Sequence, residues 1–437
     1  MINEIKQEVR QRAELLRELS DGVWQAAEVA GEETVSARLL ANALRDAGFT
    51  VEEGLGSQPT AFRATYGDSG PKIGFMAEYD ALPDLRQAVK PFQTGSDGGP
   101  GHGCGHNLLG AGSTVAAIAL ASVLRQKGTP GRVILYGTPS EETMFGKGQL
   151  LKEGFLRDVD VMLAWHPQTR MRCGGVMHNA MNSILFSFYG RTAHAAADPQ
   201  NGRSALDAAE LMNVGCNYLR EHITEGSRLH YVYTHSGEKP NIVPSYAQVW
   251  YFVRARTRAA LDEITQRVIQ VAQGAAQMTD TRVESSFLVK GTHTLVNDRL
   301  SQLAFSCAQH LEAPHFGEDC IRFAEELHRQ IPQIEPQFDT HIPCPAAGTV
   351  EYEMGSTDLS LVSHAVPTIE LCVTCFAKNT PGHHWAITAQ AGGEMGQCGT
   401  MFAAQWLALM GGRLVEDPCL LKQVQAEFQK RIADEEE

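Results

Sequence analysis

The chain has 437 residues, of which 43% are hydrophobic and 20% charged, as in an ordinary globular protein rather than a disordered one. At about 150 residues or more per domain, this length predicts about two domains. The 37 Lys and Arg residues against 51 Asp and Glu give a net charge of −14, which argues against nucleic acid or an anionic membrane as partner, since both attract concentrated positive charge.

Features that would direct the chain to a membrane or an oxidising compartment are weak. The longest apolar stretch, around residues 115–124, is far shorter than the roughly 20 residues that a bilayer span needs. The charged N-terminal segment has no apolar signal-peptide core. The ten cysteines are irregularly spaced, which does not favour a disulfide scaffold, and the apolar neighbours of Cys372 and Cys375 favour a buried strand. We therefore expect a cytoplasmic protein.

The first part of the chain alternates helical and strand patterns. Apolar spacing predicts helices near residues 3–29 and 34–48, and small residues predict a third over 107–126. Short apolar runs predict strands at 61–66, 73–77, 133–137 and 159–164. This alternation predicts an α/β fold with a mostly parallel sheet covered on both faces, whose active site lies at the carboxyl ends of the strands.

From about residue 182 the pattern changes to the β-α-β-β-α-β order of a ferredoxin-like unit. Its predicted elements are strands at 184–189, 230–234, 247–254 and 283–289, and helices at 204–220 and 260–278. The first pattern then resumes, with helices at 298–311 and 387–410 and a strand at 368–373. We expect a discontinuous catalytic, metal-binding domain over residues 1–181 and 296–437, with an inserted α+β domain over 182–295.

A glycine-rich loop, GHGCGHN (101–107), places Cys104 and His106 two residues apart at the start of a predicted helix. Glycines allow a sharp turn that can aim both side chains at one centre, and thiolate with imidazole suits a borderline-soft cation such as zinc. The competing interpretation is a buried cysteine in a helix-capping loop. His102, in the same loop, is not expected to be a ligand.

Three further motifs fall where predicted strands end. In PSEET, Glu141 and Glu142 are adjacent, so one carboxylate can bind a metal while the other transfers a proton between water and the leaving amine. In WHPQ, His166 follows an apolar strand, and in EYDALP, Asp80 can orient a ligand histidine. Each motif alone has a structural explanation, such as acidic residues at a helix N-terminus. Their common position at strand ends favours one site.

The chain resembles the M20 family of metallopeptidases and amidohydrolases, in its cysteine-ligand subgroup. The matching stretches, in the order typical of the family, are EYDALP, GHGCGHNLLGAG, the EE pair of PSEET, WHP, AHAAADPQNGRSALDA, PNIVPSYAQV, GSTD and PGHHW. The resemblance implies a pair of divalent metals, zinc or manganese with cobalt or nickel as alternatives. The implied ligands are Cys104, His106, Glu142, His166 and His383.

The other roles also follow from the resemblance. Glu141 is the implied general base and Asp80 the carboxylate behind a ligand histidine. His383 is preferred to His384 because it lies two residues before a tryptophan. The inserted domain is an implied lid and dimerisation domain, in which His194 reaches the partner subunit's site. Implied substrate-binding residues are Asn241, Arg254, Gly355 and Ser356, although a solvent-facing position explains Arg254 equally well.

The implied activity is hydrolysis of the amide bond of an N-acyl amino acid. The expected substrates are aryl or arylacetyl conjugates of glutamate or aspartate, such as p-aminobenzoyl-glutamate or indoleacetyl-aspartate. Alternatives are a dipeptidase acting on Xaa-basic dipeptides and a non-catalytic partner subunit. A homodimer through the lid is expected, and pairing with a related second chain is a further option. Residues 316–348 match no motif, and we expect them to contribute to specificity.

Overall fold

The computed structural model describes residues 1–94, 98–346 and 348–436. The chain divides into two compact units. The first contains residues 1–175, 295–350 and 362–437, and the second contains 176–294 and 351–361. Each unit has its own hydrophobic core.

A six-stranded sheet forms the centre of the first unit, in the order β1-β2-β4-β3-β5-β12. Strands β4, β3, β5 and β12 run parallel to one another, whereas β2 pairs antiparallel with both β4 and β1. The bounds are β1 Thr50–Leu55, β2 Gln58–Tyr66, β3 Lys72–Ala77, β4 Arg132–Gly137, β5 Val161–Gln168 and β12 Thr368–Thr374. The predicted α/β class with a mostly parallel sheet is confirmed. The sequence pattern missed β1, because four of its first five residues are exposed and it lacks an apolar run.

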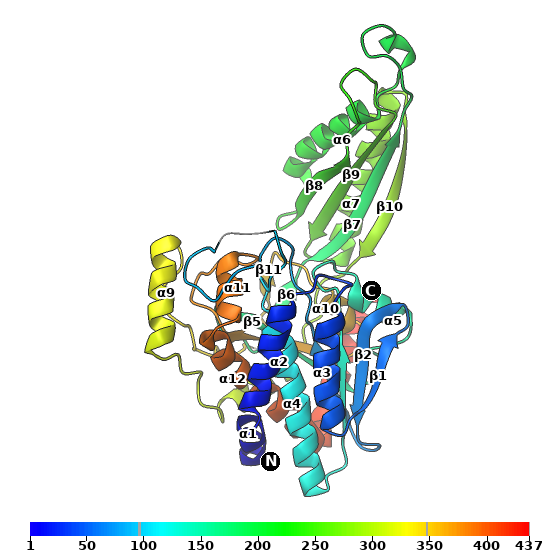
Figure 1. Cartoon of the computed structure of the whole chain (residues 1–437). Helices are drawn as coiled ribbons and strands as arrows, with labels where there is room; N and C mark the ends of the chain where they lie inside the picture. The colour runs from blue at the N-terminus through cyan, green and yellow to red at the C-terminus, as the bar shows by residue number, and fades with distance from the viewer. Residues whose placement is uncertain (95–97, 347, 437) are drawn as a thin grey trace. The chain divides into compact units, whose positions relative to one another are not determined.

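Helix α4 (His106–Lys127) is the central helix of this unit. It packs against β3, β4 and β5 and against α12, while α2 and α3 run alongside it (Figure 1). By length and composition alone α4 would pass as a membrane span, but its apolar window lies wholly inside the protein. Its hydropathy therefore reflects a core position. The other helices are α1 Ile2–Arg10, α2 Ala13–Ala26, α3 Thr34–Asp46, α5 Gly146–Lys152, α8 Asp298–Ala308, α9 Glu318–Gln330, α11 Trp385–Ala391, α12 Glu394–Glu416 and α13 Pro418–Glu436.

The single helix predicted over 387–410 is divided into α11 and α12 by Gly392 and Gly393. A Cβ on Gly392 would lie 2.5 Å from the ring of Trp24, whose indole N–H donates to the carbonyl of Thr388 at 2.9 Å. This close approach requires glycine, and it interrupts a pattern that would otherwise read as one helix.

The second unit has a four-stranded antiparallel sheet in the order β10-β7-β9-β8. Its elements follow the predicted order, with β7 Ala180–Tyr189, α6 Ala205–Leu219, β8 Arg228–His235, β9 Tyr246–Ala255, α7 Arg258–Met278 and β10 Arg282–Lys290. Burial alternates strictly along β9, because α6 and α7 pack on one face of the sheet only. Ser204 and Thr257 cap these two helices through their side-chain oxygens.

The boundaries of the second unit differ from the expected 182–295. Strand β6 (Val176–His178) pairs in parallel with β11 (Glu351–Glu353), and α10 (Leu359–Ser363) follows. The N–H of Asn179 also donates to the carbonyl of Gly355 at 2.8 Å. These contacts join residues 351–361, which we expected in the first domain, to the second unit.

Candidate metal centre

Three neighbouring strands bring their carboxyl ends together at one edge of the sheet. Glu78 and Asp80 follow β3, and Glu141 and Glu142 follow β4. His166 lies inside β5, two residues before its end, and not after the strand as expected. The reason is that β12 pairs with β5 as far as Gln168 and so extends it.

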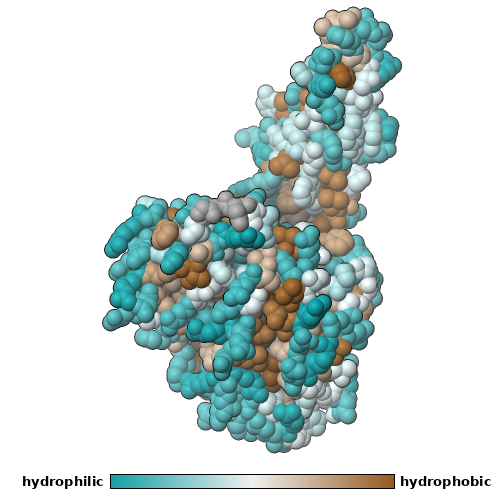
Figure 2. Space-filling view, viewed as in Figure 1, coloured by the Kyte–Doolittle hydropathy of each residue, from teal (hydrophilic) through white to brown (hydrophobic). Residues whose placement is uncertain are grey.

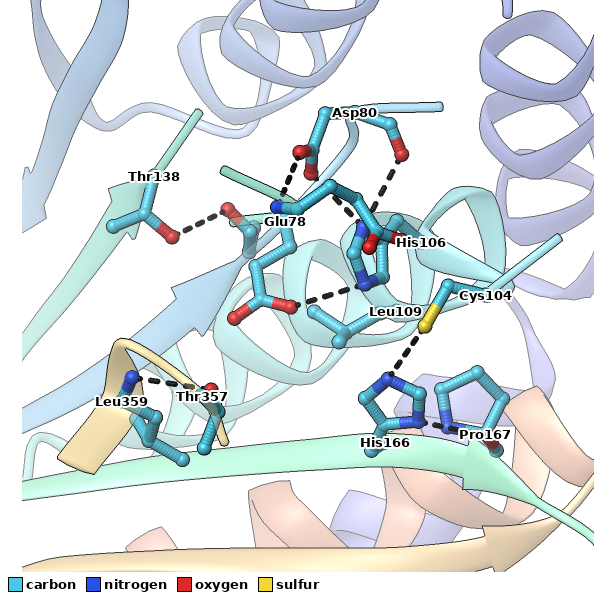
Figure 3. Close-up of polar contacts among 12 residues, drawn as sticks. Glu78, Asp80, Cys104, His106, Leu109, Thr138, His166, Pro167, Thr357 and Leu359 are labelled. Carbon is cyan, nitrogen blue, oxygen red and sulfur yellow. Dashed lines mark hydrogen bonds and ion pairs between the residues drawn. The ribbon is translucent and has the colours of Figure 1, made fainter. Parts of the chain in front are cut away.

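The glycine-rich loop before α4 supplies the second side of the site. Gly105 has a φ of 82° and acts as the N-cap of α4, and a Cβ there would lie 2.8 Å from the ring of Pro167. Only glycine fits this turn, which places Cys104 above β5 and His106 in the first turn of the helix. The Sγ of Cys104 lies 3.3 Å from the Nε2 of His166 (Figure 3).

Asp80 holds both the ring of His106 and the backbone at Glu142 in place. Its Oδ1 lies 2.9 Å from the Nδ1 of His106 (Figure 3). Its Oδ2 accepts the backbone N–H of Glu142 at 2.9 Å. Burial opposes ionisation of Asp80, but the charge of His106 and its hydrogen bond hold the carboxyl pKa below its ordinary value. With Nδ1 engaged by Asp80, the Nε2 of His106 is left for a ligand.

In the part of the chain that the structure describes, potential ligand atoms from six residues form three overlapping groups, and within each group every atom lies within 4.8 Å of the others. The groups are Cys104, His106 and His166; Cys104, Glu142 and His383; and His106, Glu141 and Glu142. The structure thus brings together the five expected ligands and the expected base.

The donor set fits divalent metal ions. Among the described residues, the buried His106 Nε2 and Glu142 Oε1 have no hydrogen-bond partner, a costly arrangement that a cation would relieve. Burial raises the pKa of the Cys104 thiol, and the carboxylates of Glu142 and Glu141 raise it further. A cation held at the same place would favour the thiolate.

The geometry supports His383 over His384 as the late histidine. The Nε2 of His383 lies 3.5 Å from a carboxylate oxygen of Glu142. The backbone N–H of His383 donates to the carbonyl of Gly103 at 3.1 Å. The Nδ1 of His384 instead accepts the N–H of Ala386 and caps α11. His383 has a φ of 50°, so its backbone is held in a conformation that most residues avoid.

His102 takes no part in these groups among the described residues. Its Nε2 lies 3.0 Å from the carbonyl of Val23, and burial lowers the pKa of its imidazole to about 4. It connects the loop to α2.

Comparison with known proteins decides the family. The model of peptidase family M20/M25/M40 matches residues 74–384, more than half of the chain. The chain belongs to this family. It is 36% identical to one of the subunits of p-aminobenzoyl-glutamate hydrolase of Escherichia coli, over 94% of the chain and 92% of that protein. It is 28% identical to the mouse Xaa-Arg dipeptidase, over 98% and 92% respectively.

The M20 fold is also found among solved structures. A Bacillus subtilis protein described as a dinuclear metal-binding peptidase of the M20 family superposes with a TM-score of 0.60 at 17% identity, over 93% of this chain and 99% of that one. The predicted family and fold are therefore confirmed, and this M20 member is a hydrolytic enzyme.

The expected functional residues of the second unit lie in two separate sets. His194 forms a bridge with Ile242, and the N–H of Ala195 donates to the carbonyl of Asn241 at 3.0 Å, so His194 and Asn241 are neighbours before the start of β9. Arg254, near the other end of β9, donates to Ser356 Oγ at 3.1 Å. At about 3.3 Å per residue, the eight residue steps from Tyr246 to Arg254 separate these sets by about 26 Å.

A buried ion pair behind His106 was not expected from the sequence. Glu78, which follows β3, is buried, and its carboxylate lies 2.8 Å from the Nζ of the fully buried Lys147 on α5. Its second oxygen lies 3.5 Å from the Nε2 of His106 (Figure 3). Glu78 could be suspected from its position after a strand, whereas the sequence around Lys147 offers no such signal.

Replacing Lys147 by Met should destabilise the protein by about 3–5 kcal/mol, because it leaves the Glu78 carboxylate buried without its counter-ion. Urea denaturation of the metal-loaded protein measures this change. The double variant Lys147→Met/Glu78→Gln should recover most of the lost stability. A cost below about 1 kcal/mol for the single variant would mean that the pair contributes little.

The segment 316–348, for which the sequence suggested no role, contacts the residues on either side of His383. The structure describes all of this segment except residue 347. Its helix α9 packs through Ala324 and Leu327 in one cluster with Ala377 and Ala386. After α9, Glu335 accepts hydrogen bonds from the side chains of Lys378 and Asn379, both at 2.8 Å. This segment therefore supports the loop that carries His383.

Proposed function

We propose that this M20 enzyme is a metal-dependent amidohydrolase that cleaves the amide bond of an N-acyl amino acid. The observation that carries the proposal is the convergence of thiol, imidazole and carboxylate atoms from Cys104, His106, Glu142, His166 and His383, with Glu141 beside them. These residues come from four segments that are far apart in the sequence, so chance proximity is a poor explanation. A solely structural zinc site would have no use for the additional carboxylate.

These five residues would hold two divalent cations per subunit. Thiolate favours zinc, whereas the carboxylate and imidazole ligands also accept manganese, cobalt or nickel. Such ions lower the pKa of a coordinated water towards 7 and polarise the substrate carbonyl. Asp80 would keep the His106 ring in the tautomer that leaves Nε2 available.

Glu141 is the proposed general base. It is partly exposed and lies in one group with His106 and Glu142, so its carboxylate can face substrate while its neighbour binds metal. It would remove a proton from the attacking water and deliver it to the departing amine nitrogen. Both carboxylates are half-buried, and their adjacent positions after β4 let one bind metal while the other faces substrate.

His194 is the proposed donor to the scissile carbonyl. Its Nδ1 accepts the N–H groups of Ala196 and Ala197, at 3.2 and 3.1 Å. The neutral imidazole then carries its proton on Nε2, the nitrogen left to donate to a carbonyl oxygen that becomes negative. The side chain is exposed on its own unit, as a residue acting in a partner subunit's site would be.

The substrate should carry a free carboxylate, which we assign to Arg254 together with Ser356 and Gly355. The Nε of Arg254 is buried without a hydrogen-bond partner, and no carboxylate of the described residues pairs with its guanidinium. Arg228 lies directly opposite in the β8–β9 register, an unfavourable pair of like charges unless an anion joins them. Asn241 would contribute from the His194 set.

An aryl or arylacetyl conjugate of glutamate or aspartate is the preferred substrate class. The similarity to a p-aminobenzoyl-glutamate hydrolase chain over nearly the whole length supports it. A dipeptidase acting on Xaa-basic dipeptides is the second candidate, favoured by the similarity to an Xaa-Arg dipeptidase. Both need the substrate carboxylate.

Arg254→Met should raise KM for such substrates about tenfold or more, because the substrate carboxylate loses its proposed cationic partner. A tenfold change corresponds to about 1.4 kcal/mol of binding free energy. Steady-state kinetics on p-aminobenzoyl-glutamate measure this change, with the analogue whose α-carboxylate is a carboxamide as the reference substrate. Arg256→Met is the matched control, since that exposed side chain stacks on Tyr352. If Arg254→Met raised KM equally for the carboxylate and the carboxamide substrate, Arg254 would not recognise the carboxylate.

We propose a cytoplasmic homodimer that forms through the second unit. Its helix α6 exposes Leu211, Val214 and Tyr218 on one face, and β8 is an edge strand of the sheet. Hydrophobic residues are visible on this unit's surface in Figure 2. Two copies could pair along β8 and cover these side chains. Pairing with a related second chain is the alternative, because the hydrolase of the Escherichia coli relative has two kinds of subunit.

One experiment separates the candidate functions. The chain is purified alone, stripped with a chelator, and assayed with Zn²⁺, Mn²⁺, Co²⁺ or Ni²⁺ on acyl-glutamates, acyl-aspartates and Xaa-Arg dipeptides. We expect activity to disappear with the metal and to return on acyl-glutamates or acyl-aspartates. Preference for Xaa-Arg would favour the dipeptidase. Absence of turnover with every metal would favour a non-catalytic partner subunit.

A further inference from the structure

Two free cysteines meet outside the metal centre, in a part of the chain that the proposed hydrolysis does not use. Cys320 lies in the first turn of α9, and Cys398 lies near the start of α12. Cys320 belongs to a small hydrophobic cluster with Phe316 and Met395, Cys398 packs against this cluster, and the two thiols lie close enough to shift each other's pKa. We call Cys320 and Cys398 the thiol pair.

The two members of the thiol pair differ in access. Cys320 is buried, whereas Cys398 is partly exposed and lines a groove of about 550 Å³. Charged residues of both signs line the same groove, including Arg10, Arg17, Glu14 and Glu312. A zwitterionic peptide that carries a sulfur can therefore approach Cys398, while Cys320 is reached only through its partner.

The thiols are also electronically unequal. The interaction with Cys320 lowers the pKa of Cys398, whereas burial and the nearby carboxylate of Glu394 raise it, and the charge of Arg17 lowers it by a smaller amount. The same interaction between the thiols, together with burial, raises the pKa of Cys320. An accessible thiol with a lowered pKa beside a protonated partner is the arrangement of a nucleophilic and a resolving cysteine.

We propose that Cys398 and Cys320 are a reversible redox pair that reacts with a small peptide disulfide of the oxidised glutathione type. The Cys398 thiolate attacks one sulfur of the disulfide, forms a mixed disulfide and releases one thiolate. Cys320 then loses its proton and attacks Cys398 Sγ, which forms the Cys320–Cys398 bond and releases the second thiolate. The two cysteines are oxidised by two electrons, and the peptide disulfide is reduced to two thiols.

The cross-link would join α9 to α12. Because α9 also packs beside Ala377 and Ala386, it would secure the segment that supports the His383 loop. The thiol pair thus gives the otherwise unassigned α9 a chemical connection to the catalytic unit.

The test uses the metal-loaded, full-length protein with the exposed Cys344 and Cys419 changed to Ser, so that these thiols do not react. It is incubated with oxidised glutathione without denaturant, alkylated, and mapped by mass spectrometry. We expect a loss of two thiols, no retained glutathione, and one Cys320–Cys398 peptide. A stable mixed disulfide on Cys398, or no reaction of either cysteine, would overturn the proposal.

Two variants identify the order of the steps. Cys320→Ser should stop after the first step and keep one glutathionyl group on Cys398. Cys398→Ser should leave Cys320 reduced, because Cys320 is buried. Glutathionylation of Cys320 in Cys398→Ser would contradict the assigned roles, and circular dichroism shows whether each variant is folded. The result in the parent protein tests the pair without either substitution.

Discussion

Replacing Glu141 by Gln should lower kcat by about 10²–10⁴-fold, because the amide cannot accept the proton of the attacking water. Gln has nearly the same shape, and Glu141 is not among the five residues assigned to the metals. Metal content and thermal unfolding should therefore stay close to those of the parent protein. Steady-state kinetics and elemental analysis on the same preparation measure both quantities.

Glu142→Gln is the matched control for this prediction. Glu142 differs from its neighbour in being placed by Asp80 and in lying 3.5 Å from His383. Its replacement should reduce metal content together with activity. If Glu141→Gln retained more than about a tenth of the parent activity, a barrier change below about 1.4 kcal/mol, Glu141 would not be the general base.

Replacing His194 by Ala should lower kcat by about 10²–10³-fold, the effect typical of losing one donor to an oxyanion. The fold should be unaffected, because the exposed side chain bonds only to the adjacent Ala196 and Ala197 N–H groups among its described contacts. Assays with saturating substrate and restored metal measure this loss. Loss confined to KM would instead indicate a role in binding.

Mixing the Glu141→Gln variant with the His194→Ala variant tests whether His194 acts in the partner subunit. In a random mixture of equal parts, half of the dimers are mixed, and each has one site with both Glu141 and the partner's His194, giving about a quarter of the parent activity. Dissociation and reassociation of separately purified proteins would produce the mixture. No recovery in mixtures proven to contain mixed dimers would place His194 in its own subunit's site.

The parts of the centre that depend on strand ends could be predicted from the sequence. Glu142 and Asp80 follow short apolar strands, and parallel strands bring their carboxyl ends to one edge. The loop with Cys104 was recognisable because its glycines precede a helix. His383 is different, since neither its periodicity nor its neighbours distinguish it from His384, and only the family pattern indicated it.

Other features could not be predicted because they arise from tertiary contacts. The Lys147–Glu78 pair joins residues 69 positions apart, and nothing local to α5 indicates a buried lysine. Three-residue strands pair β6 with β11 and so move residues 351–361 into the second unit, against the expected boundary. Arg254 has the alternating pattern of any strand residue, and only its unpaired, buried Nε distinguishes it.

The most direct test of the metal centre is anomalous diffraction from crystals of the metal-loaded protein, recorded above and below the absorption edge of the bound metal. We predict two peaks per subunit, within coordination distance of Cys104, His106, Glu142, His166 and His383, with Glu141 outside the direct ligands. A single peak, peaks elsewhere, or coordination by His384 in place of His383 would contradict this assignment.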